Sequence, residues 1–250
     1  MSGHSKWSTI KHKKAAQDAK RGKVFTRLIK EITVAARMGG GDPEANPRLR
    51  TAIAGAKAAN MPADNIKRAV QKGTGELPGV TYEEVFYEGY GPGGVAILLE
   101  VLTDNRMRTT PEIRHLFSKH GGNLGEPNSV AWMFDKVGQL RVPCAGVTED
   151  RLMELVLEAG AEDMQRDEEA DHFEVVSSPE VFPALQRALE EAGIETAESG
   201  ISMEPKNVVH LEGKKAEQCL RLLEFLEDHD DVQNAYANLE VDDDDVGGEG

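Results

Sequence analysis

A cationic stretch with a helical hydrophobic period, residues 4–38, constrains this chain more than any other feature of its 250 residues. At about 100° per residue, Phe25, Leu28 and Ile32 fall on one face of a helix. Most of the cations fall on roughly the opposite face, and the glycines at 39–41 can adopt the positive φ that ends helices. The stretch therefore predicts a helix over about 18–38 that buries an apolar stripe and exposes a basic ridge.

The basic ridge suits the regular negative charge of a nucleic-acid backbone. The alternative is the solvated face of an ordinary amphipathic helix. Such faces usually mix charges of both signs, whereas only Asp18 and Glu31 oppose the cations here. Trp7 either stacks on a base or docks on the helical module, and both alternatives stay open. We predict that nucleic acid is contacted by Lys6, Trp7, Lys11, His12, Lys13, Lys14, Lys20, Arg21, Lys23, Arg27, Lys30 and Arg37, with Lys67, Arg68 and Lys72 extending the surface.

Charge is divided unevenly along the chain. Residues 1–75 hold 16 Lys and Arg against 5 Asp and Glu, a net charge of +11, whereas residues 76–250 have a net charge of −26. This division predicts a basic contact module on an acidic body that repels phosphates. Cys144 and Cys219 form no metal-binding or disulfide pattern, and the sequence has no apolar leader or long hydrophobic run. We expect a cytoplasmic protein without a membrane anchor.

The hydrophobic pattern changes its period near residue 80. Before this point, further helices are predicted at about 47–60 and from Pro62 to about 72, which completes a small helical bundle. After it, strands alternate with amphipathic helices. The predicted strands are 82–90, 95–102, 129–142, 173–176, 194–203, 208–211 and 232–241, and the predicted helices lie within 103–122, 148–160, 179–192 and 214–227. Thr110 is predicted to cap the first of these helices, with Pro111 as its first residue.

This order of elements predicts an α+β fold with three domains: an N-terminal helical bundle followed by two α/β domains with antiparallel sheets, one inserted in the other. The predicted boundaries are 1–75 for the basic helical domain, 76–141 with 206–241 for a discontinuous α/β domain, 142–205 for the inserted domain, and 242–250 for an acidic, disordered tail. A less favoured alternative makes the tail an acidic metal site.

Two internal motifs leave alternatives open. The sequence GYGPGG, residues 89–94, is either a tight turn between strands or a phosphate-binding loop. We favour the turn, because no Lys-Ser/Thr pair follows and no helix opens there. The acidic body also holds a single basic cluster, which forms either a second contact surface or, as we favour, ion pairs with the surrounding acids. Its members are Arg106, Arg108, Arg114 and Lys119.

Catalytic motifs are missing from the sequence. None of the seven His residues pairs with another in an i, i+4 ligand motif, and there is no nucleophile elbow, Walker loop or dinucleotide fingerprint. The many carboxylates fall on predicted surface faces. We therefore expect no enzymatic activity, no cofactor, no metal and no small-molecule substrate.

Several long motifs resemble those of one known family. The chain closely resembles the YebC/PmpR family of transcriptional regulators in GHSKW (3–7), KHKKAAQDAKRGKVFTRLIKEI (11–32), NPRLRTAI and NMPADNIKRAVQKGTG (within 46–75), YEGYGPGGVA (87–96) and LTDNRMRT (102–109). The resemblance runs from residue 3 to about 241. The family includes a mitochondrial relative that activates translation of cytochrome oxidase subunit I. The chain departs from the pattern at Met107, where Asn is commoner, and at EPNSV (126–130), which lacks the Gly often found before Ser129.

The resemblance implies three domains and a cytoplasmic, non-enzymatic protein that binds nucleic acid. Some members resemble DNA-binding regulators, and others resemble ribosome-associated factors that help translate difficult sequences such as proline runs. We expect a sequence-tolerant, DNA-binding regulator of gene expression, with a translation factor that binds ribosomal RNA as the alternative. The alternative gains from a Lys-rich arm of the kind that folds on RNA and from the lack of a helix N-terminus with clear base-reading residues. A regulator that acts through protein partners of the acidic body is the third hypothesis.

Overall fold

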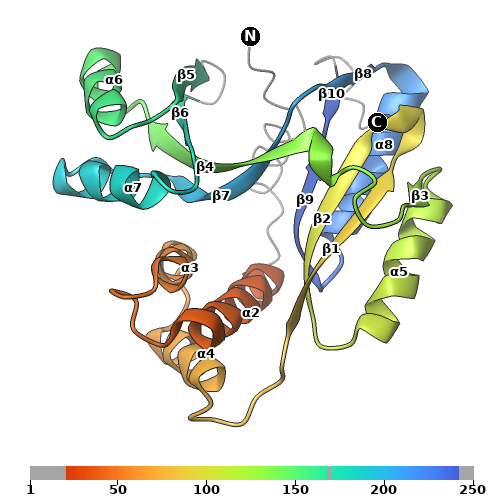
Figure 1. Ribbon diagram of the computed structural model, residues 1–250, viewed down its shortest axis with the longest axis horizontal. Helices are drawn as coiled ribbons and strands as arrows, with labels where there is room; N and C mark the ends of the chain where they lie inside the picture. The colour runs from red at the N-terminus through yellow and green to blue at the C-terminus, as the bar shows by residue number, and fades with distance from the viewer. Residues whose placement is uncertain (1–20, 168–170, 242–250) are drawn as a thin grey trace. The chain divides into compact units, whose positions relative to one another are not determined.

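The computed structural model describes residues 21–167 and 171–241. Its first three helices are α2 (Arg21–Gly39), α3 (Pro47–Ala58) and α4 (Ala63–Thr74), which pack together (Figure 1). Their core holds Ile32, Leu49 and Ile66, with Phe25 and Leu28 packed against it. The predicted apolar face of α2 is therefore the face that enters this core.

Asn46 joins α2 to α3. Its side-chain oxygen accepts a hydrogen bond from the backbone N–H of Leu49 at 3.1 Å, which caps α3. Its amide nitrogen donates to the carbonyl oxygens of Ala35 at 2.8 Å and Gly40 at 2.9 Å. Asn46 is buried, so its polar side chain is used entirely within the bundle.

The helices α2 and α4 approach each other at a glycine. A Cβ atom added to Gly73 would lie 2.4 Å from the carbonyl oxygen of Thr33 and 2.7 Å from the Cβ of Ala36. The Thr33 hydroxyl also donates to the carbonyl of Ala69 on α4, at 3.3 Å. Any side chain at position 73 would push the two helices apart, so this crossing requires glycine.

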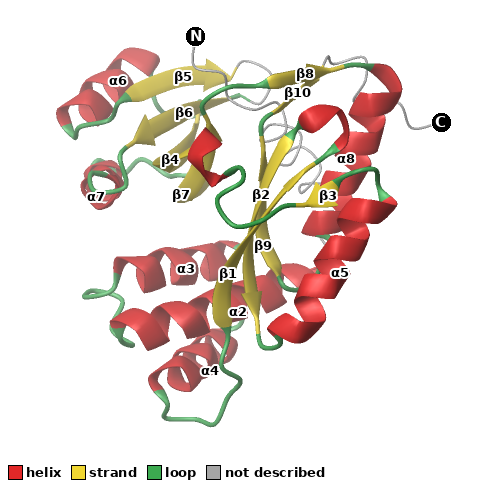
Figure 2. Ribbon diagram, turned by 45° about the vertical axis from the view of Figure 1, so that its right-hand side comes forward, coloured by secondary structure: helices red, strands yellow, loops and turns green. Residues whose placement is uncertain are grey.

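The first sheet has the strand order β3-β1-β2-β9. Its strands are β1 (Glu83–Tyr90), β2 (Ala96–Thr103), β3 (Asn123–Leu124) and β9 (Val232–Ala237), all paired antiparallel. The helices α5 (Arg106–Lys119) and α8 (Gly213–Glu227) lie side by side on one face of this sheet (Figures 1 and 2). The core between these helices and the sheet contains Ile113 and Phe117 of α5 and Leu222, Leu223 and Leu226 of α8.

The glycine-rich segment 89–94 adopts the turn alternative. It connects β1 to β2 through a short 3-10 helix, η1 (Pro92–Gly94). The backbone N–H of Gly91 donates to the carbonyl of Val95 at 2.8 Å, and Gly93 and Gly94 have φ values of 74° and 84°. These positive φ values are the reason why glycine is needed in the turn.

Several predicted elements have different bounds in the structure: the strand predicted at 129–142 begins at Phe134, and the strand predicted at 194–203 begins at Glu198. The helix α5 begins at Arg106 and is capped by Asn105, whose side chain accepts from the N–H of Arg108; the predicted cap at Thr110 is therefore wrong. Pro111 lies inside the helix, within its first two turns. A proline is common at the first position of a helix, which is why Pro111 was predicted there. In the structure Asn105 caps the helix, which therefore begins about one turn before Pro111.

The predicted strand 232–241 is divided between two sheets. Residues 232–237 form β9, whereas β10 (Leu239–Val241) pairs in parallel with β8 (Val209–Leu211). Asn238 lies between them and is buried, with its side-chain oxygen accepting from the N–H of Ala96 at 2.7 Å. The side chain of Asn238 thus replaces a strand partner where the chain changes sheets.

Residues 135–204 form a second compact unit. It contains β4 (Phe134–Pro143), α6 (Glu149–Glu158), β5 (Asp163–Asp167), β6 (His172–Ser177), α7 (Phe182–Glu191) and β7 (Glu198–Pro205), with the sheet order β5-β6-β4-β7. A 3-10 helix, η2 (Ala131–Met133), precedes β4. The core of the unit includes Leu140, Val175 and Leu185.

Residues 135–141 were predicted to belong to the discontinuous domain, and this part of the prediction is wrong. They belong to the second compact unit, in which residues 138–141 pair with β6 and β4 lies between β6 and β7. The predicted α+β class, with N-terminal helices followed by two antiparallel sheets, is confirmed. No helix within 21–167 or 171–241 is long and apolar enough to cross a membrane.

Candidate nucleic-acid interface

The cations of α2 point at an acidic turn, residues 227–231, that connects α8 to β9. The Nζ atom of Lys23 lies 2.8 Å from a carboxylate oxygen of Asp228, and the guanidinium of Arg27 donates to the carbonyl of Glu227. One turn further along α2, Lys30 reaches the same segment. The three side chains are spaced four and three residues apart, so they lie along one side of the helix.

Lys30 makes the most buried of these contacts. Its Nζ atom lies 2.7 Å from a carboxylate oxygen of Asp231 and also donates to the carbonyls of Asp230 at 2.9 Å and Leu102 at 3.3 Å. Lys30 is 6% exposed and Asp231 is 2% exposed. Three acceptors satisfy the three protons of the ammonium group, which is what a buried Lys requires.

Burial by itself would raise the pKa of Asp231. Hydrogen bonds from Lys30, Thr109 and Arg108 to the carboxylate outweigh burial and hold its pKa at about 2. Thr109 donates from Oγ1 at 2.7 Å, and Arg108 donates from a guanidinium nitrogen. The Asp231 carboxylate is therefore fully ionised at neutral pH and shared by two helices, α2 and α5.

Two further cations of the bundle are engaged near the start of β1. The guanidinium of Arg37 donates to the backbone carbonyl of Tyr82. Arg48 on α3 forms ion pairs with Glu31 at 2.6 Å and Glu84 at 3.1 Å. The hydrogen bond to Glu31 raises the pKa of Arg48, so its charge is permanent. These cations hold the chain's own segments together.

The cations of α4 have a different environment. Lys67, Arg68 and Lys72 are exposed, and none has a hydrogen bond or ion pair with any residue that the structure describes. Lys72 lies over the following loop, where a Cβ on Gly79 would be 3.1 Å from its Cβ and Cγ. The stem of Lys72 is thus fixed while its ammonium group stays in solvent.

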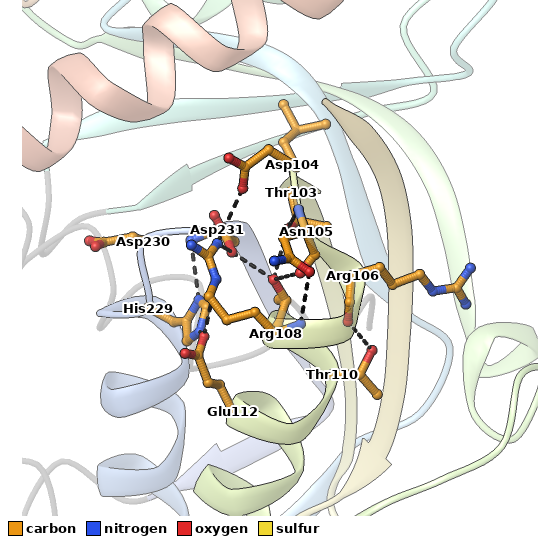
Figure 3. A network of polar contacts seen from close by, with 12 residues as sticks. Thr103, Asp104, Asn105, Arg106, Arg108, Thr110, Glu112, His229, Asp230 and Asp231 are labelled. Atoms are coloured by element: carbon orange, nitrogen blue, oxygen red, sulfur yellow. Dashed lines mark hydrogen bonds and ion pairs between the residues drawn. The ribbon is translucent and has the colours of Figure 1, made fainter. Parts of the chain in front are cut away.

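The motif TDNRMRT, residues 103–109, forms the polar network shown in Figure 3. Thr103 and Thr109 share a hydrogen bond of 2.7 Å, and the N–H of Asn105 donates to Thr103 Oγ1 at 3.0 Å. Arg108 forms ion pairs with Asp104 and Glu112 in addition to Asp231. For Arg108, the ion-pair alternative of the sequence analysis is the one observed.

The side chains of Arg106 and Met107 take no part in this network, although the Arg106 carbonyl accepts a hydrogen bond from the Thr110 hydroxyl at 2.9 Å. The side chain of Arg106 points away from the other residues of the motif in Figure 3, and Met107 is 87% exposed. The motif thus uses its polar residues to fix the start of α5 and presents these two side chains to solvent.

One group of side chains resembles a metal site. Ligand atoms of Glu112, His229 and Asp231 lie within 4.8 Å of one another. The Nδ1 atom of His229 accepts from the N–H of Asp231 at 3.1 Å, and its Nε2 atom faces Glu112 at 3.0 Å. With Nδ1 accepting, the proton of the neutral ring lies on Nε2 and is donated to the Glu112 carboxylate. We interpret the group as a hydrogen-bonded end of the Asp231 network.

Comparison with known proteins identifies the family. A model of the N-terminal domain of TACO1/YebC proteins matches residues 5–76, and a model of the second and third domain of TACO1/YebC matches residues 82–239. The chain belongs to the TACO1/YebC family. The resemblance predicted from the motifs is thereby confirmed.

Relatives in this family carry the name of a regulator. The "Probable transcriptional regulatory protein" of Desulfatibacillum aliphaticivorans is 61% identical over 247 residues, which cover 99% of each chain. Relatives in Desulfotalea psychrophila and Acidobacterium capsulatum are 61% and 59% identical and cover 97% and 96% of this chain, and 96% and 97% of their own. A crystal structure of a conserved hypothetical protein from Aquifex aeolicus is 47% identical, with a TM-score of 0.83 over 90% of this chain and 93% of that chain.

The structure of this TACO1/YebC protein separates the predicted contact residues into groups. The predicted residues Lys6, Trp7, Lys11, His12, Lys13, Lys14 and Lys20 lie outside the described residues, as does the side chain of Arg21. Lys67, Arg68 and Lys72 are exposed on α4. The continuous, solvent-facing ridge predicted for α2 is wrong: Lys30 is buried, and Lys23, Arg27 and Arg37 are bound to the protein itself.

The sequence alone could not show that the cations of α2 are bound by the protein's own acceptors. The acceptors of Lys23, Arg27 and Lys30 in the turn 227–231 lie 200 or more positions away in the sequence, and the Leu102 carbonyl that Lys30 also contacts lies 72 positions away. The one local signal was the acidic run Asp228, Asp230 and Asp231, whose charge matches that of the cations on α2.

Proposed function

We propose that this TACO1/YebC protein is a non-enzymatic regulator of gene expression that binds DNA through its basic N-terminal region. Its relatives carry the name of a probable transcriptional regulatory protein. The observation that carries the proposal is the segregation of charge: a net charge of +11 in residues 1–75 and of −26 in residues 76–250. Such a division favours approach to a polyanion from the basic end.

Within the described residues, the proposal assigns phosphate contact to Lys67, Arg68 and Lys72. They are exposed, free of acidic partners in the described part of the chain, and carried on a helix that packs tightly on α2. The basic segment 6–21 is the second part of the proposed contact. Lys23, Arg27, Lys30 and Arg37 are assigned a positioning role, because their charges are already neutralised or hydrogen-bonded within the protein.

The proposed contact is to the backbone of DNA and not to its bases. Base readout commonly uses polar side chains at the start of a helix. The start of α4 carries the acidic Asp64, and the cap of α3, Asn46, is buried and saturated with hydrogen bonds. Binding through Lys67, Arg68 and Lys72 is therefore expected to be sequence-tolerant and strongly dependent on salt.

A salt titration tests this proposal. The full chain and the variant K67E/R68E/K72E are titrated with a short, fluorescently labelled DNA duplex between about 50 and 200 mM salt. We expect the slope of log K against log salt to fall by about 2 to 3, because each phosphate contact contributes about 0.9.

A charge-matched variant serves as the control. K136E/R151E/R187E reverses three exposed cations in residues 135–204 and changes the net charge by the same amount. We expect this control to bind DNA with a slope close to that of the parent. Equal slopes for the two triple variants would exclude α4 as a contact surface, and no binding by the parent would exclude the proposed function.

The second candidate function is a ribosome-associated translation factor that binds ribosomal RNA. The observation that favours it is the Lys-rich composition of residues 6–21, which is of the kind that folds on RNA. In addition, Arg48 in the first turn of α3 is engaged by Glu31 and Glu84 and is not free to read a base. Crosslinking in cells, with RNA and DNA sequenced separately, distinguishes the two candidates. Discrete promoter peaks support the transcriptional proposal, and reads concentrated at a few positions of ribosomal RNA support the translational one.

A further inference from the structure

A second cationic surface lies on the acidic part of the chain, where α5 and α8 run side by side. We call it the α5–α8 patch and define it by His115, Lys119 and His120 of α5 with Arg221 and Phe225 of α8. The ring of Phe225 stacks on His120, with centroids 4.5 Å apart and an interplanar angle of 23°. The Nζ atom of Lys119 lies 5.8 Å from the centroid of the same ring. These contacts place the Lys119 cation and the rings of His120 and Phe225 on one surface, and Arg221 lies near enough to lower the pKa of His120.

Helical phase explains why these residues meet. On α8, Gln218, Arg221 and Phe225 follow at intervals of three and four residues, on the side away from the buried Leu223. Gln218 lies near Gly121, just after α5, at 3.7 Å from a Cβ built there. This stripe of α8 therefore faces the C-terminal end of α5, where Lys119 lies over the Phe225 ring.

The cations of the patch are not neutralised by the protein. Lys119, Arg221 and His115 are exposed, and none forms an ion pair with an acid in the part of the chain that the structure describes. Arg221 has Glu217 and Glu224 within helical reach, but it makes no ion pair with either. In a segment with a net charge of −26, cations that stay unpaired and cluster together are unusual.

The lowered pKa of His120 reflects, besides partial burial, the positive charge of this surface. Partial burial lowers its pKa, and the neighbouring charges of Lys119, Arg221 and His115 lower it further. Its Nε2 atom is buried and has no hydrogen-bond partner among the described residues. An anion that bound beside Lys119 and Arg221 would reverse this electrostatic effect and favour the imidazolium form.

Phe225 supplies a feature that a simple anion site does not need. It is a large apolar side chain that remains 43% exposed. His120 stacks on the Phe225 ring and the Lys119 ammonium group lies over it, and the exposed part of the ring is what could meet a base. Cations beside an exposed aromatic ring are the usual means of holding a single-stranded nucleic acid, whose phosphates meet the charges and whose unpaired bases stack.

We infer that the α5–α8 patch is a second nucleic-acid surface that binds a single strand, with phosphates at Lys119 and Arg221 and a base stacked on Phe225. The inference rests on the proposed function and extends it from the basic N-terminal region to the α/β part of the chain. Glu112 is held by His229 and Arg108 at the other end of α5, so a bound strand would be confined to the end near Lys119.

A comparison of the parent chain with two variants tests the inference. The full chain, K119E/R221E and F225L are titrated with a labelled oligouridine strand and with a DNA duplex of equal length. We expect K119E/R221E to bind the single strand about tenfold more weakly and to lower the salt slope by about 1.4, which is about 0.7 for each of two contacts. We expect F225L to weaken single-strand binding about fivefold and to leave duplex binding unchanged, because only an unpaired base can stack.

Arg114 provides the matched control. It is an exposed cation on α5, but helical phase places it on the side of the helix away from α8. R114E/R106E changes the net charge by the same amount as K119E/R221E and is expected to bind the single strand within twofold of the parent. Circular dichroism of each variant verifies that the helices are retained.

The outcomes separate the inference from the proposed function. If the parent binds duplex and K119E/R221E binds the single strand as the parent does, the α5–α8 patch is excluded and the proposed function stands. If R114E/R106E weakens binding as much as K119E/R221E, the effect is one of general charge and the patch is likewise excluded. If the parent binds neither nucleic acid, the proposed function itself fails.

Discussion

The Nζ atom of Lys30 lies 2.7 Å from a carboxylate oxygen of Asp231, although the two residues are 201 positions apart in the sequence. The pair joins α2 to the turn between α8 and β9, and both side chains are buried. The composition of α2 suits nucleic acid, but its central cation, Lys30, binds the protein's own acidic turn. The contact connects the helical bundle to the sheet that follows it.

Replacing Lys30 with Met is expected to destabilise the protein by about 3 kcal/mol, because removing one partner leaves a buried charge incompletely compensated. Arg108 and Thr109 continue to hold Asp231, which limits the loss. Chemical denaturation measures the change. Lys23→Met is the control: its pair with Asp228 is largely exposed, and we expect a loss of less than about 1 kcal/mol. Equal losses would mean that burial of the Lys30 pair has no energetic role.

Acid is expected to weaken the fold through Asp231. Its pKa is lowered from 3.8 to about 2 in the folded protein, so its contribution is complete above pH 3.8 and is lost as the pH falls toward 2. This difference in the pKa of Asp231 between the unfolded and folded states corresponds to about 2 kcal/mol of folding free energy. The free energy of unfolding is measured between pH 5 and pH 2 for the parent and for Asp231→Asn. The gap between the two curves should narrow as the pH falls; a constant gap would contradict the assignment.

Glu88 is expected to hold the loop 125–133 in place. Its buried carboxylate accepts hydrogen bonds of 2.7 Å from the backbone N–H groups of Asn128, Val130 and Ala131. In Glu88→Gln the amide NH₂ would face an N–H group, and we expect a loss of about 2 to 3 kcal/mol. The fluorescence of the exposed Trp132, measured in a Trp7→Phe background, reports the loop directly.

The exposed Glu83, on the same strand, is the control for Glu88. Glu83→Gln is expected to change the stability by less than about 0.5 kcal/mol and to leave Trp132 fluorescence unchanged. A similar fluorescence change in both variants would show that strand charge, and not the hydrogen bonds of Glu88, affects the loop.

Two glycines of the bundle are expected to respond to alanine in opposite directions. Gly73→Ala should destabilise the bundle by about 1 to 3 kcal/mol, since its Cβ would lie 2.4 Å from the carbonyl oxygen of Thr33. Gly55→Ala should stabilise it by about 0.5 to 1 kcal/mol, because Gly55 lies within α3 and its Cβ would meet only Leu28, at 3.5 Å. Thermal unfolding of both variants checks the sign. Stabilisation by Gly73→Ala would contradict the close crossing of α2 and α4.

Local patterns in the sequence predicted the elements well where short-range physics controls them. The period of Phe25, Leu28 and Ile32 marked the buried face of α2, and Pro47 marked the first residue of α3. The GYGPGG segment was recognised as a turn, because no Lys-Ser/Thr pair follows it and no helix opens there. The start of α5 was misplaced, because a capping side chain at Asn105 and a helix-starting proline at Pro111 competed within one segment.

Partnership between distant residues could not be predicted in the same way. Charge and helical phase placed Lys23, Arg27 and Lys30 on one side of α2, but they do not tell whether that side meets solvent, nucleic acid or protein. Likewise, the cluster of Arg106, Arg108, Arg114 and Lys119 was treated as one group. In the structure Arg108 is bound to Asp231, Lys119 lies over Phe225 of α8, and Arg114 is exposed.

The sequence by itself determined the family, the α+β class, the division of charge and the faces of the helices, because each depends on residues close together in the chain. Only the tertiary structure decided which cations remain free to bind a ligand. A lysine on a helix has the same local pattern whether it is exposed, as Lys67 is, or buried against a carboxylate, as Lys30 is. The difference depends on which distant acid the fold brings within hydrogen-bonding distance, and electrostatic energy falls with that distance and rises with burial.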